Sequence, residues 1–368
     1  MLIYAYLLKR LTGNKDYPDK GIVATLTKAS PREPADYYFT PLFALMPYIP
    51  PMVEDMKRRN VPDAVISGTI SEFEDKILDF KDRNHVPGIC SYIHWLKMFT
   101  DLDIIRIGRF NMQINKKFPG NVTVYRRKMA AEGAEIAVAE DATMAAAAGR
   151  DTAARVPPAM EGPASAVHAR SSFAILANGV TIHKSGMILG SAGCEDTDGS
   201  FDAKIDETDD YFEGFPARAD GLVNAEKIRL LKTEWEVALR KDDNVVSVHI
   251  PARLSLDSDY CDLSYARARE IFSRHYPEYA YKAFMCQSWM MSPQLRILLG
   301  RETNLTRFID RYMSYPVKAT GTAVMDFVFF KKGKPEIKDL PEDTSLMRAI
   351  KNHYLAGGYV YEMGGVFF

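Results

Sequence analysis

The spacing of apolar and polar residues changes several times along this 368-residue chain, and each change predicts a different element. Between Ile66 and Phe80, apolar side chains recur every three or four positions, which is the period of a helix with one buried face. Around residues 110–124 the period falls to two on both sides of the Pro119-Gly120 turn, which predicts a pair of strands. We therefore expect residues 1–127 to form a mainly helical domain that ends in a β-hairpin.

The middle of the chain has a different composition. Residues 128–170 are rich in alanine and carry no sustained apolar stripe, so we expect a surface insertion between two strands. Strand patterns return in residues 171–243, and the Asn178-Gly179 pair is typical of a two-residue type I′ hairpin. With a second hairpin expected within 187–201, this region should complete or bridge a sheet.

The last third of the chain, residues 244–368, alternates strands and helices. Residues 244–251 show a period of two, a capped helix runs from Ser258 to just before Pro277, and 283–289 form a short apolar strand. This order predicts a right-handed crossover with two parallel strands, whose C-terminal ends meet at one rim, where ligands of such sheets bind. Further helices are expected at 304–312 and 344–355, and further strands at 323–330 and 359–368.

The composition fits this organisation and narrows the function. With 47% hydrophobic and 26% charged residues, the chain can bury more than one core. We predict an α/β protein, α+β overall, in which an N-terminal helical and β-hairpin domain packs on a C-terminal mixed sheet with flanking helices. A net charge of -1 leaves no global positive field to hold nucleic acid or an anionic membrane.

The ends and the cysteines give two further expectations. The apolar run near the start is too short to span a membrane and lacks a signal-peptide cleavage pattern, so we expect a cytoplasmic protein. The four cysteines, Cys90, Cys194, Cys261 and Cys286, are scattered without a CxxC pair. This spacing predicts free thiols, with neither a metal site nor a disulfide framework.

Several segments of the last third, taken in order, resemble one family. They include VHIP at 248–251, FSRHYP at 272–277, FMCQSWMMSP at 284–293, Thr303-Asn304 and Arg307-Phe308. This pattern resembles a two-domain bacterial acyltransferase family, which has an N-acyltransferase N-terminal domain and a GNAT-like C-terminal domain, here at 244–368. The resemblance implies transfer of an acyl group, first of all acetyl, from acyl-CoA to a small-molecule amine or a peptide.

The same resemblance implies where the acyl-CoA binds. In a GNAT-like sheet it lies between two splayed parallel strands, with its pyrophosphate at the N-terminus of the next helix. The cofactor-binding residues implied here are Val248, Ile250, Arg253, Asn304 and Arg307. The loop after Arg253 lacks the glycines with which GNAT enzymes let the backbone approach phosphate, and Asp257 and Asp259 at the helix start would oppose an anion.

Acyl transfer to an amine also needs a base and an acid for the leaving thiolate. His249 is the candidate base, because an imidazole titrates near neutral pH and this one lies at a strand end. Tyr312 is the candidate acid, because it follows Asn304 at nearly the spacing of the Asn and Tyr of GNAT enzymes. Trp289 and His275 are candidates for contact with the acceptor.

Two other functions remain open at this point. Cys286 and Ser288 share a strand face that His275 could approach, which would suit a covalent acyl-enzyme in a transferase or a hydrolase. A buried structural thiol is the alternative for Cys286. The glycine-free loop would also fit a non-catalytic protein that uses a GNAT-like fold to bind a small ligand or a partner.

Overall fold

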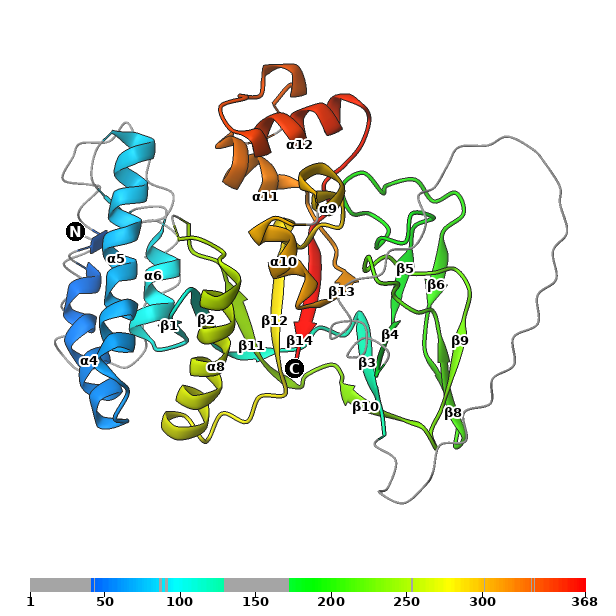
Figure 1. The fold of residues 1–368 in the computed structure, drawn as a ribbon, viewed down its shortest axis with the longest axis horizontal. Helices are drawn as coiled ribbons and strands as arrows, with labels where there is room; N and C mark the ends of the chain where they lie inside the picture. The colour runs from blue at the N-terminus through cyan, green and yellow to red at the C-terminus, as the bar shows by residue number, and fades with distance from the viewer. Residues whose placement is uncertain are drawn as a thin grey trace, which may run out of the picture.

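A six-stranded mixed sheet lies at the centre of the computed structural model (Figure 1), which describes residues 41–42, 44–85, 88–89, 92–128, 172–252, 254–300, 302–331, 333 and 335–368. In spatial order its strands are β1 (Ile104–Ile107), β2 (Phe110–Lys117), β11 (Asn244–His249), β12 (Ala283–Ser288), β14 (Met363–Phe367) and β13 (Met313–Pro316). Strands β11 and β12 are parallel, and the other neighbouring pairs are antiparallel. The predicted mixed sheet and its parallel pair are confirmed.

Three helices cover one edge and one face of this sheet. They are α4 (Ile49–Arg58), which follows the short η1 (Met46–Tyr48), α5 (Asp63–Asn84) and α6 (Ile93–Thr100). Helix α5 lies along edge strand β1, where Thr69 Oγ1 accepts the backbone N–H of Arg106 at 3.1 Å. Helix α6 packs Leu96 and Phe99 against Ile104 of β1. The N-terminal helices therefore pack on the sheet, as the predicted fold class requires.

The opposite face is covered by the crossover helix α8 (Ser258–His275), which joins β11 to β12. The Asp257 side chain caps this helix by accepting the backbone N–H groups of Asp259 and Tyr260. Its buried Tyr265 ring lies 5.0 Å from the Phe110 ring of β2 and 5.2 Å from the Phe284 ring of β12. The strand, helix and strand predicted in this part of the chain are confirmed.

A group of short helices lies beyond the C-terminal end of β12 (Figure 1). It consists of η3 (Trp289–Met291), α9 (Gln294–Leu299), α10 (Asn304–Asp310), α11 (Thr322–Val324), η4 (Met325–Phe329), η5 (Ile337–Asp339) and α12 (Ser345–Leu355). The helices expected at 304–312 and 344–355 are therefore present. The strand expected at 359–368 is β14, which begins four residues later, at Met363.

Smaller sheets form the part of the molecule drawn on the right of Figure 1. They are β10 (Trp235–Leu239), β3 (Val122–Arg127) and β4 (Phe173–Ala177); β5 (Val180–Ile182) and β6 (Phe201–Ala203); and β7 (Asp206–Glu207), β8 (Tyr211–Gly214) and β9 (Ile228–Leu231). The alanine-rich stretch expected to be an insertion falls, apart from Lys128, outside the described residues.

Two of the predicted hairpins, at Pro119-Gly120 and at Asn178-Gly179, are wrong about strand partners, although the strands themselves exist. Strands β2 and β3 flank the Pro119-Gly120 turn but belong to different sheets, because β2 pairs with β11 while β3 pairs with β10. The segment from β2 to β3 instead runs antiparallel to the segment from β10 to β11, and it passes from one sheet to the other where Phe118 N–H donates to the Asp243 carbonyl at 2.8 Å. Likewise Gly179 has the predicted positive φ of +65°, yet β4 pairs with β3 and β5 pairs with β6.

The strand predicted at 323–330 is also wrong, because this segment is helical. It forms α11 and the π-helical η4, preceded by Gly321 at φ +76° and ended by Phe330 at φ +53°. A short, continuous apolar run has no periodicity that separates a strand from a buried helix. Gly321, just before it, makes the positive-φ turn that starts the helix.

The fold buries the described cysteines. Cys194, Cys261 and Cys286 are buried and free, as predicted, and Cys90 lies outside the described residues. None of the helices in the described part of the chain combines the length and apolar character needed to cross a membrane.

Candidate functional site

The two parallel strands at the centre of the sheet separate before they end. Strands β11 and β12 are paired at Val245–Ala283, Val246–Phe284 and Ser247–Met285, and the described ladder between them stops there. Beyond this point β11 follows β2 as far as His249, while β12 follows β14 as far as Ser288. The facing backbone groups of Val248 and Cys286 are left without a strand partner, so a ligand with its own donors and acceptors can bind between them.

On the face covered by α5 and α6, polar side chains form a row that ends at this separation. Arg106 of β1 lies opposite Asn111 of β2, and Asn111 lies opposite His249 of β11. Arg106 and Asn111 are buried, and His249 is half-buried. The next position along β2, Met112, points to the other face, into the apolar core under α8. We call Arg106, Asn111 and His249 the polar row.

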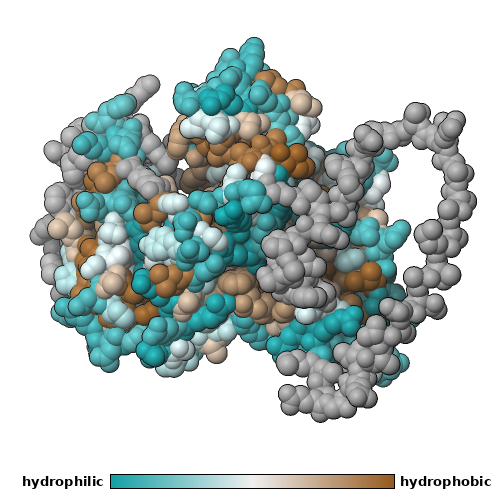
Figure 2. All heavy atoms as spheres, in the orientation of Figure 1, coloured by the Kyte–Doolittle hydropathy of each residue, from teal (hydrophilic) through white to brown (hydrophobic). Residues whose placement is uncertain are grey.

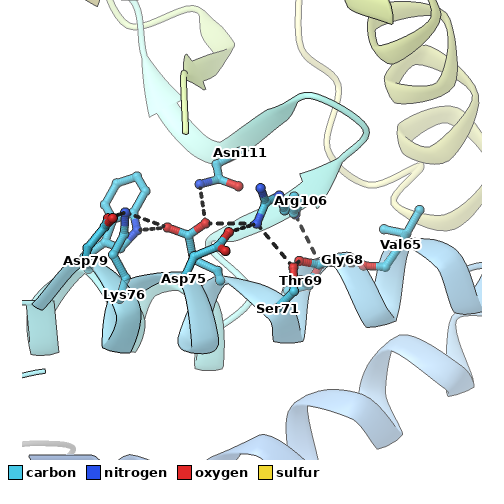
Figure 3. Close-up of polar contacts among 11 residues, drawn as sticks. Val65, Gly68, Thr69, Ser71, Asp75, Lys76, Asp79, Arg106 and Asn111 are labelled. Carbon is cyan, nitrogen blue, oxygen red and sulfur yellow. Dashed lines mark hydrogen bonds and ion pairs between the residues drawn. The ribbon is translucent and has the colours of Figure 1, made fainter. Parts of the chain in front are cut away.

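Glu72 of α5 connects the polar row to the helices. Its fully buried carboxylate accepts hydrogen bonds from Trp95 Nε1 at 2.7 Å and Asn111 Nδ2 at 3.0 Å. Lys76 Nζ and Arg106 Nη1 form ion pairs with it at 3.2 and 3.5 Å. Figure 3 shows Arg106 and Asn111 reaching from the strands towards α5, where Lys76 lies. These donors come from four different elements, so the carboxylate fixes both helices on the sheet.

His249 is the predicted residue that the structure places at the end of the polar row. Its Nε2 donates to Gln113 Oε1 at 2.9 Å, and its ring meets the Trp95 ring edge-on at 4.9 Å. This tautomer leaves Nδ1 as an acceptor. Burial, helped by the charge of Lys116, lowers the pKa of His249 to about 4, so the expected titration near neutral pH is corrected. At pH 7 the imidazole is neutral.

Tyr312 and Cys286 lie on the opposite face, deep in the core. The Tyr312 hydroxyl is 2.5 Å from the Tyr265 hydroxyl, and burial raises its pKa well above the ordinary value. Burial likewise raises the pKa of Cys286 to about 12, so its thiol stays protonated at neutral pH. Both side chains are 1% exposed. Neither position favours the catalytic role expected for it.

The other candidates for catalysis and acceptor binding are not brought together. Ser288 is half-buried at the end of β12 and accepts the Met290 N–H at 3.1 Å, and Trp289 is 9% exposed and packs in the core. His275 lies at the C-terminal end of α8, where its Nδ1 donates to the Arg59 carbonyl at 2.8 Å. Because β12 begins near the end of α8 and Ser288 is its last residue, Ser288 lies at the opposite end of the sheet from His275, so His275 cannot act on it.

The loop between β11 and α8 gathers part of the predicted cofactor-binding set. Val248 and Ile250 lead into this loop, and Asn304 Nδ2 of α10 lies 3.5 Å from Ser255 Oγ within it. Arg307 instead pairs with Glu302 at 2.9 Å on the surface. Arg253 lies outside the described residues. The carbonyl of Ser255 accepts Arg109 Nε at 2.8 Å, which adds a residue that sequence reasoning missed.

No sequence pattern marks four of the polar residues of this site as functional. They are Glu72, Asn111, Gln113 and Arg109. Polar residues that alternate along a strand, as Asn111 and Gln113 do, usually mark a face in contact with solvent. Glu72 falls between apolar positions of an amphipathic helix, where a surface carboxylate is common. A pocket of about 580 Å³, lined by Phe272, Tyr281 and Phe284 among others, lies where β12 begins, at the end of the sheet away from the separation.

The family model of the GNAT-like C-terminal domain matches residues 104–367. The chain belongs to this family. The resemblance found in the sequence is therefore confirmed, and the match begins at β1 and so takes in the polar row, whereas the domain was expected to begin at residue 244. No curated protein matches the chain.

Solved structures agree with the GNAT-like assignment. One is an acyltransferase in complex with decanoyl-CoA and teicoplanin, with a TM-score of 0.52, 16% identity, and coverage of 95% of this chain and 75% of that one. Another is an acyltransferase mutant in complex with octanoyl-CoA, with a TM-score of 0.52, 14% identity, and coverage of 96% and 80%. At this identity they show a shared fold. Family and fold together support the predicted class, an acyltransferase enzyme.

Proposed function

We propose that this GNAT-like protein transfers an acyl group from acyl-CoA to an amine. The observation that carries the proposal is the separation of β11 and β12 after Ser247 and Met285, at the rim where the neutral acceptor nitrogen of His249 also lies. The backbone of Val248 offers partners for the amides of a pantetheine arm. The similar structures with decanoyl-CoA and octanoyl-CoA support this donor class.

In the proposed reaction the amine nitrogen attacks the thioester carbonyl carbon, the C–N bond forms and the C–S bond breaks. The proton lost by the amine passes to His249 Nδ1, directly or through one water, and then to the departing thiolate. With a pKa of about 4, His249 is a weak base that is never blocked by protonation at neutral pH. Direct transfer of this kind needs no nucleophile from the protein.

The length of the acyl group belongs to the same proposal. The four most exposed large apolar side chains in the described part of the chain lie on α9, on or just after η4, and on α12, the helices beyond the C-terminal end of β12; they are Ile297, Phe327, Phe330 and Leu355. Figure 2 shows apolar surface gathered around this upper helical part. Such surface favours an acyl chain longer than acetyl. A cytoplasmic location, where acyl-CoA is made and used, stays a prediction.

The proposal is tested in two steps with the purified chain. First, melting temperatures are measured with CoA, acetyl-CoA, octanoyl-CoA and decanoyl-CoA, because a ligand of the folded state raises the melting temperature. Second, thiol release is followed with a panel of small amines and amino-terminated peptides, against a control without acceptor. No shift with any donor at millimolar concentration would exclude acyl-CoA as the substrate.

A non-catalytic binding protein is the second candidate, and one observation favours it. Asp257 already occupies the N–H groups of Asp259 and Tyr260, which an incoming pyrophosphate would otherwise use. If CoA binds but no acceptor in the panel accelerates thiol release, this second function is preferred. A covalent route has less support, because the Cys286 thiol is enclosed and protonated.

A further inference from the structure

Arg109, in the turn between β1 and β2, is a buried cation without an acidic partner. Its side chain is 2% exposed, and its Nη1 is buried with no hydrogen-bond partner in the described structure. Among the described residues its side chain has one hydrogen bond, from Nε to the Ser255 carbonyl at 2.8 Å, and no ion pair. Burial lowers the pKa of Arg109, and the charge of the neighbouring cation Arg106 lowers it further. Arginine is rarely buried unless it is paired, so an uncompensated guanidinium indicates a missing anion.

The turn holds this side chain firmly at the start of α8. Gly108 has φ +58°, and a Cβ there would come within 2.4 Å of Ser264 Oγ, so the backbone of the turn presses directly on the helix. The N–H of Arg109 donates to the same Ser264 Oγ at 2.8 Å. From this anchor the side chain extends to Ser255, two residues before the cap Asp257. Its direction is therefore set by the fold.

The donors that a loop of this kind usually offers to phosphate are missing or occupied here. No glycine lies between Pro251 and Asp257 to bring the backbone close. The first free amides of α8 are held by the Asp257 carboxylate at 3.1 and 3.2 Å. Among the described groups at this end of the helix, Arg109 Nη1 is thus a positively charged donor that still has no hydrogen-bond partner.

We infer that Arg109 binds a phosphate of the acyl donor and supplies, from the β1–β2 turn, the charge that the glycine-free loop does not. The inference rests on the proposed function and deepens it by naming the residue that makes the protein select a phosphorylated donor. A guanidinium presents two parallel N–H groups that match two phosphate oxygens, which an ammonium cannot do. Asn304 Nδ2, 3.5 Å from Ser255 Oγ, contacts the same loop.

Calorimetry with a series of ligands tests this assignment. Dissociation constants are measured for CoA, for dephospho-CoA, which lacks the 3′-phosphate, and for pantetheine, which has no phosphate. Arg109→Met should weaken CoA binding at least tenfold and leave pantetheine binding unchanged, while Arg109→Lys should fall between. Arg274→Met is the matched control, because Arg274 is an exposed arginine on the last turn of the same helix, paired with Glu270.

The outcomes distinguish failure of the proposed function from failure of the assignment of Arg109. If the unmodified protein binds none of these ligands, the proposed function fails. If it binds CoA and Arg109→Met binds CoA equally well, only the assignment of Arg109 is overturned. Should the variants not fold, a crystal structure of the unmodified chain with CoA decides: a phosphate oxygen within hydrogen-bond distance of a guanidinium nitrogen of Arg109 supports the inference, and phosphates held elsewhere refute it.

Discussion

The two faces of the central sheet differ sharply at the place where β11 and β12 separate. Towards α5 and α6, the strands carry the polar row Arg106, Asn111 and His249, tied together by Glu72. Towards α8, the same strands carry only apolar or enclosed groups near this point, among them Met112, Val248 and Cys286. Both faces are covered by helices, so burial alone does not distinguish them. What differs is that one face carries a neutral imidazole with an acceptor nitrogen on the last residue of β11.

The largest expected effect concerns the group that holds the polar face together. Glu72→Ala removes the acceptor of Trp95 Nε1 and Asn111 Nδ2 and leaves these two donors unsatisfied, while Arg106 keeps its ion pair with Asp75 at 2.6 Å. We expect the free energy of unfolding to fall by about 3–5 kcal/mol, measured by urea denaturation. Glu74→Ala, an exposed carboxylate on the same helix, is the control and should change it by less than about 0.5 kcal/mol. Equal effects of the two substitutions would show that the buried carboxylate does not anchor the helices.

The second prediction asks which face carries the chemistry. His249→Ala should lower the turnover number about 100-fold or more, because it removes the proton acceptor at the rim. The loss is measured as thiol release at saturating donor. His94→Ala, on the exposed side of α6, is the matched control and should keep full turnover. An active His249→Ala enzyme would move the base to another residue.

Local elements of the GNAT-like part were predictable because their signals are local. The alternation of 244–249 and the cap before Ser258 depend on neighbouring residues, and both elements begin where the pattern indicated. Strand partners depend on residues far away in sequence. The Asn178-Gly179 pair fixed a turn with positive φ, but not the pairing of β4 with β3. A turn sets the direction of the chain, and the sheet is set by tertiary packing.

The candidate site was predictable only in part, for the same reason. Period two correctly placed His249 and Ser247 on one face of β11, and Cys286 and Ser288 on one face of β12. This period-two pattern gave no information on which face of the sheet α8 would cover. Arg109 was missed because a single arginine in a turn has no pattern, and its burial arises only when the turn docks on Ser264. Such residues become visible only through unpaired atoms in a packed structure.

The third prediction uses the lowered pKa of His249, about 4 against an ordinary 6.5. Between these values the unfolded chain binds a proton at this residue and the folded protein does not, so stability falls as the pH falls from 6.5 towards 4. We expect this residue to remove about 2 kcal/mol of unfolding free energy between pH 7.5 and pH 4.5. Urea denaturation of the unmodified protein and of His249→Gln at both pH values isolates the effect, since the variant lacks the titrating group. If both proteins lose the same amount, the imidazole is not buried in its neutral form.

The smallest expected effect belongs to the opposite face. Cys286→Ala removes one buried sulfur from the core under α8, which should cost about 1 kcal/mol of unfolding free energy. Turnover should change less than threefold, because a thiol with a pKa near 12 contributes no thiolate at neutral pH. The measurement is thiol release, together with the intact mass of the protein after incubation with donor alone. An acylated protein whose extra mass disappears in Cys286→Ala would reverse the comparison, because the chemistry would then lie on the enclosed face, with the polar row serving only to hold the helices.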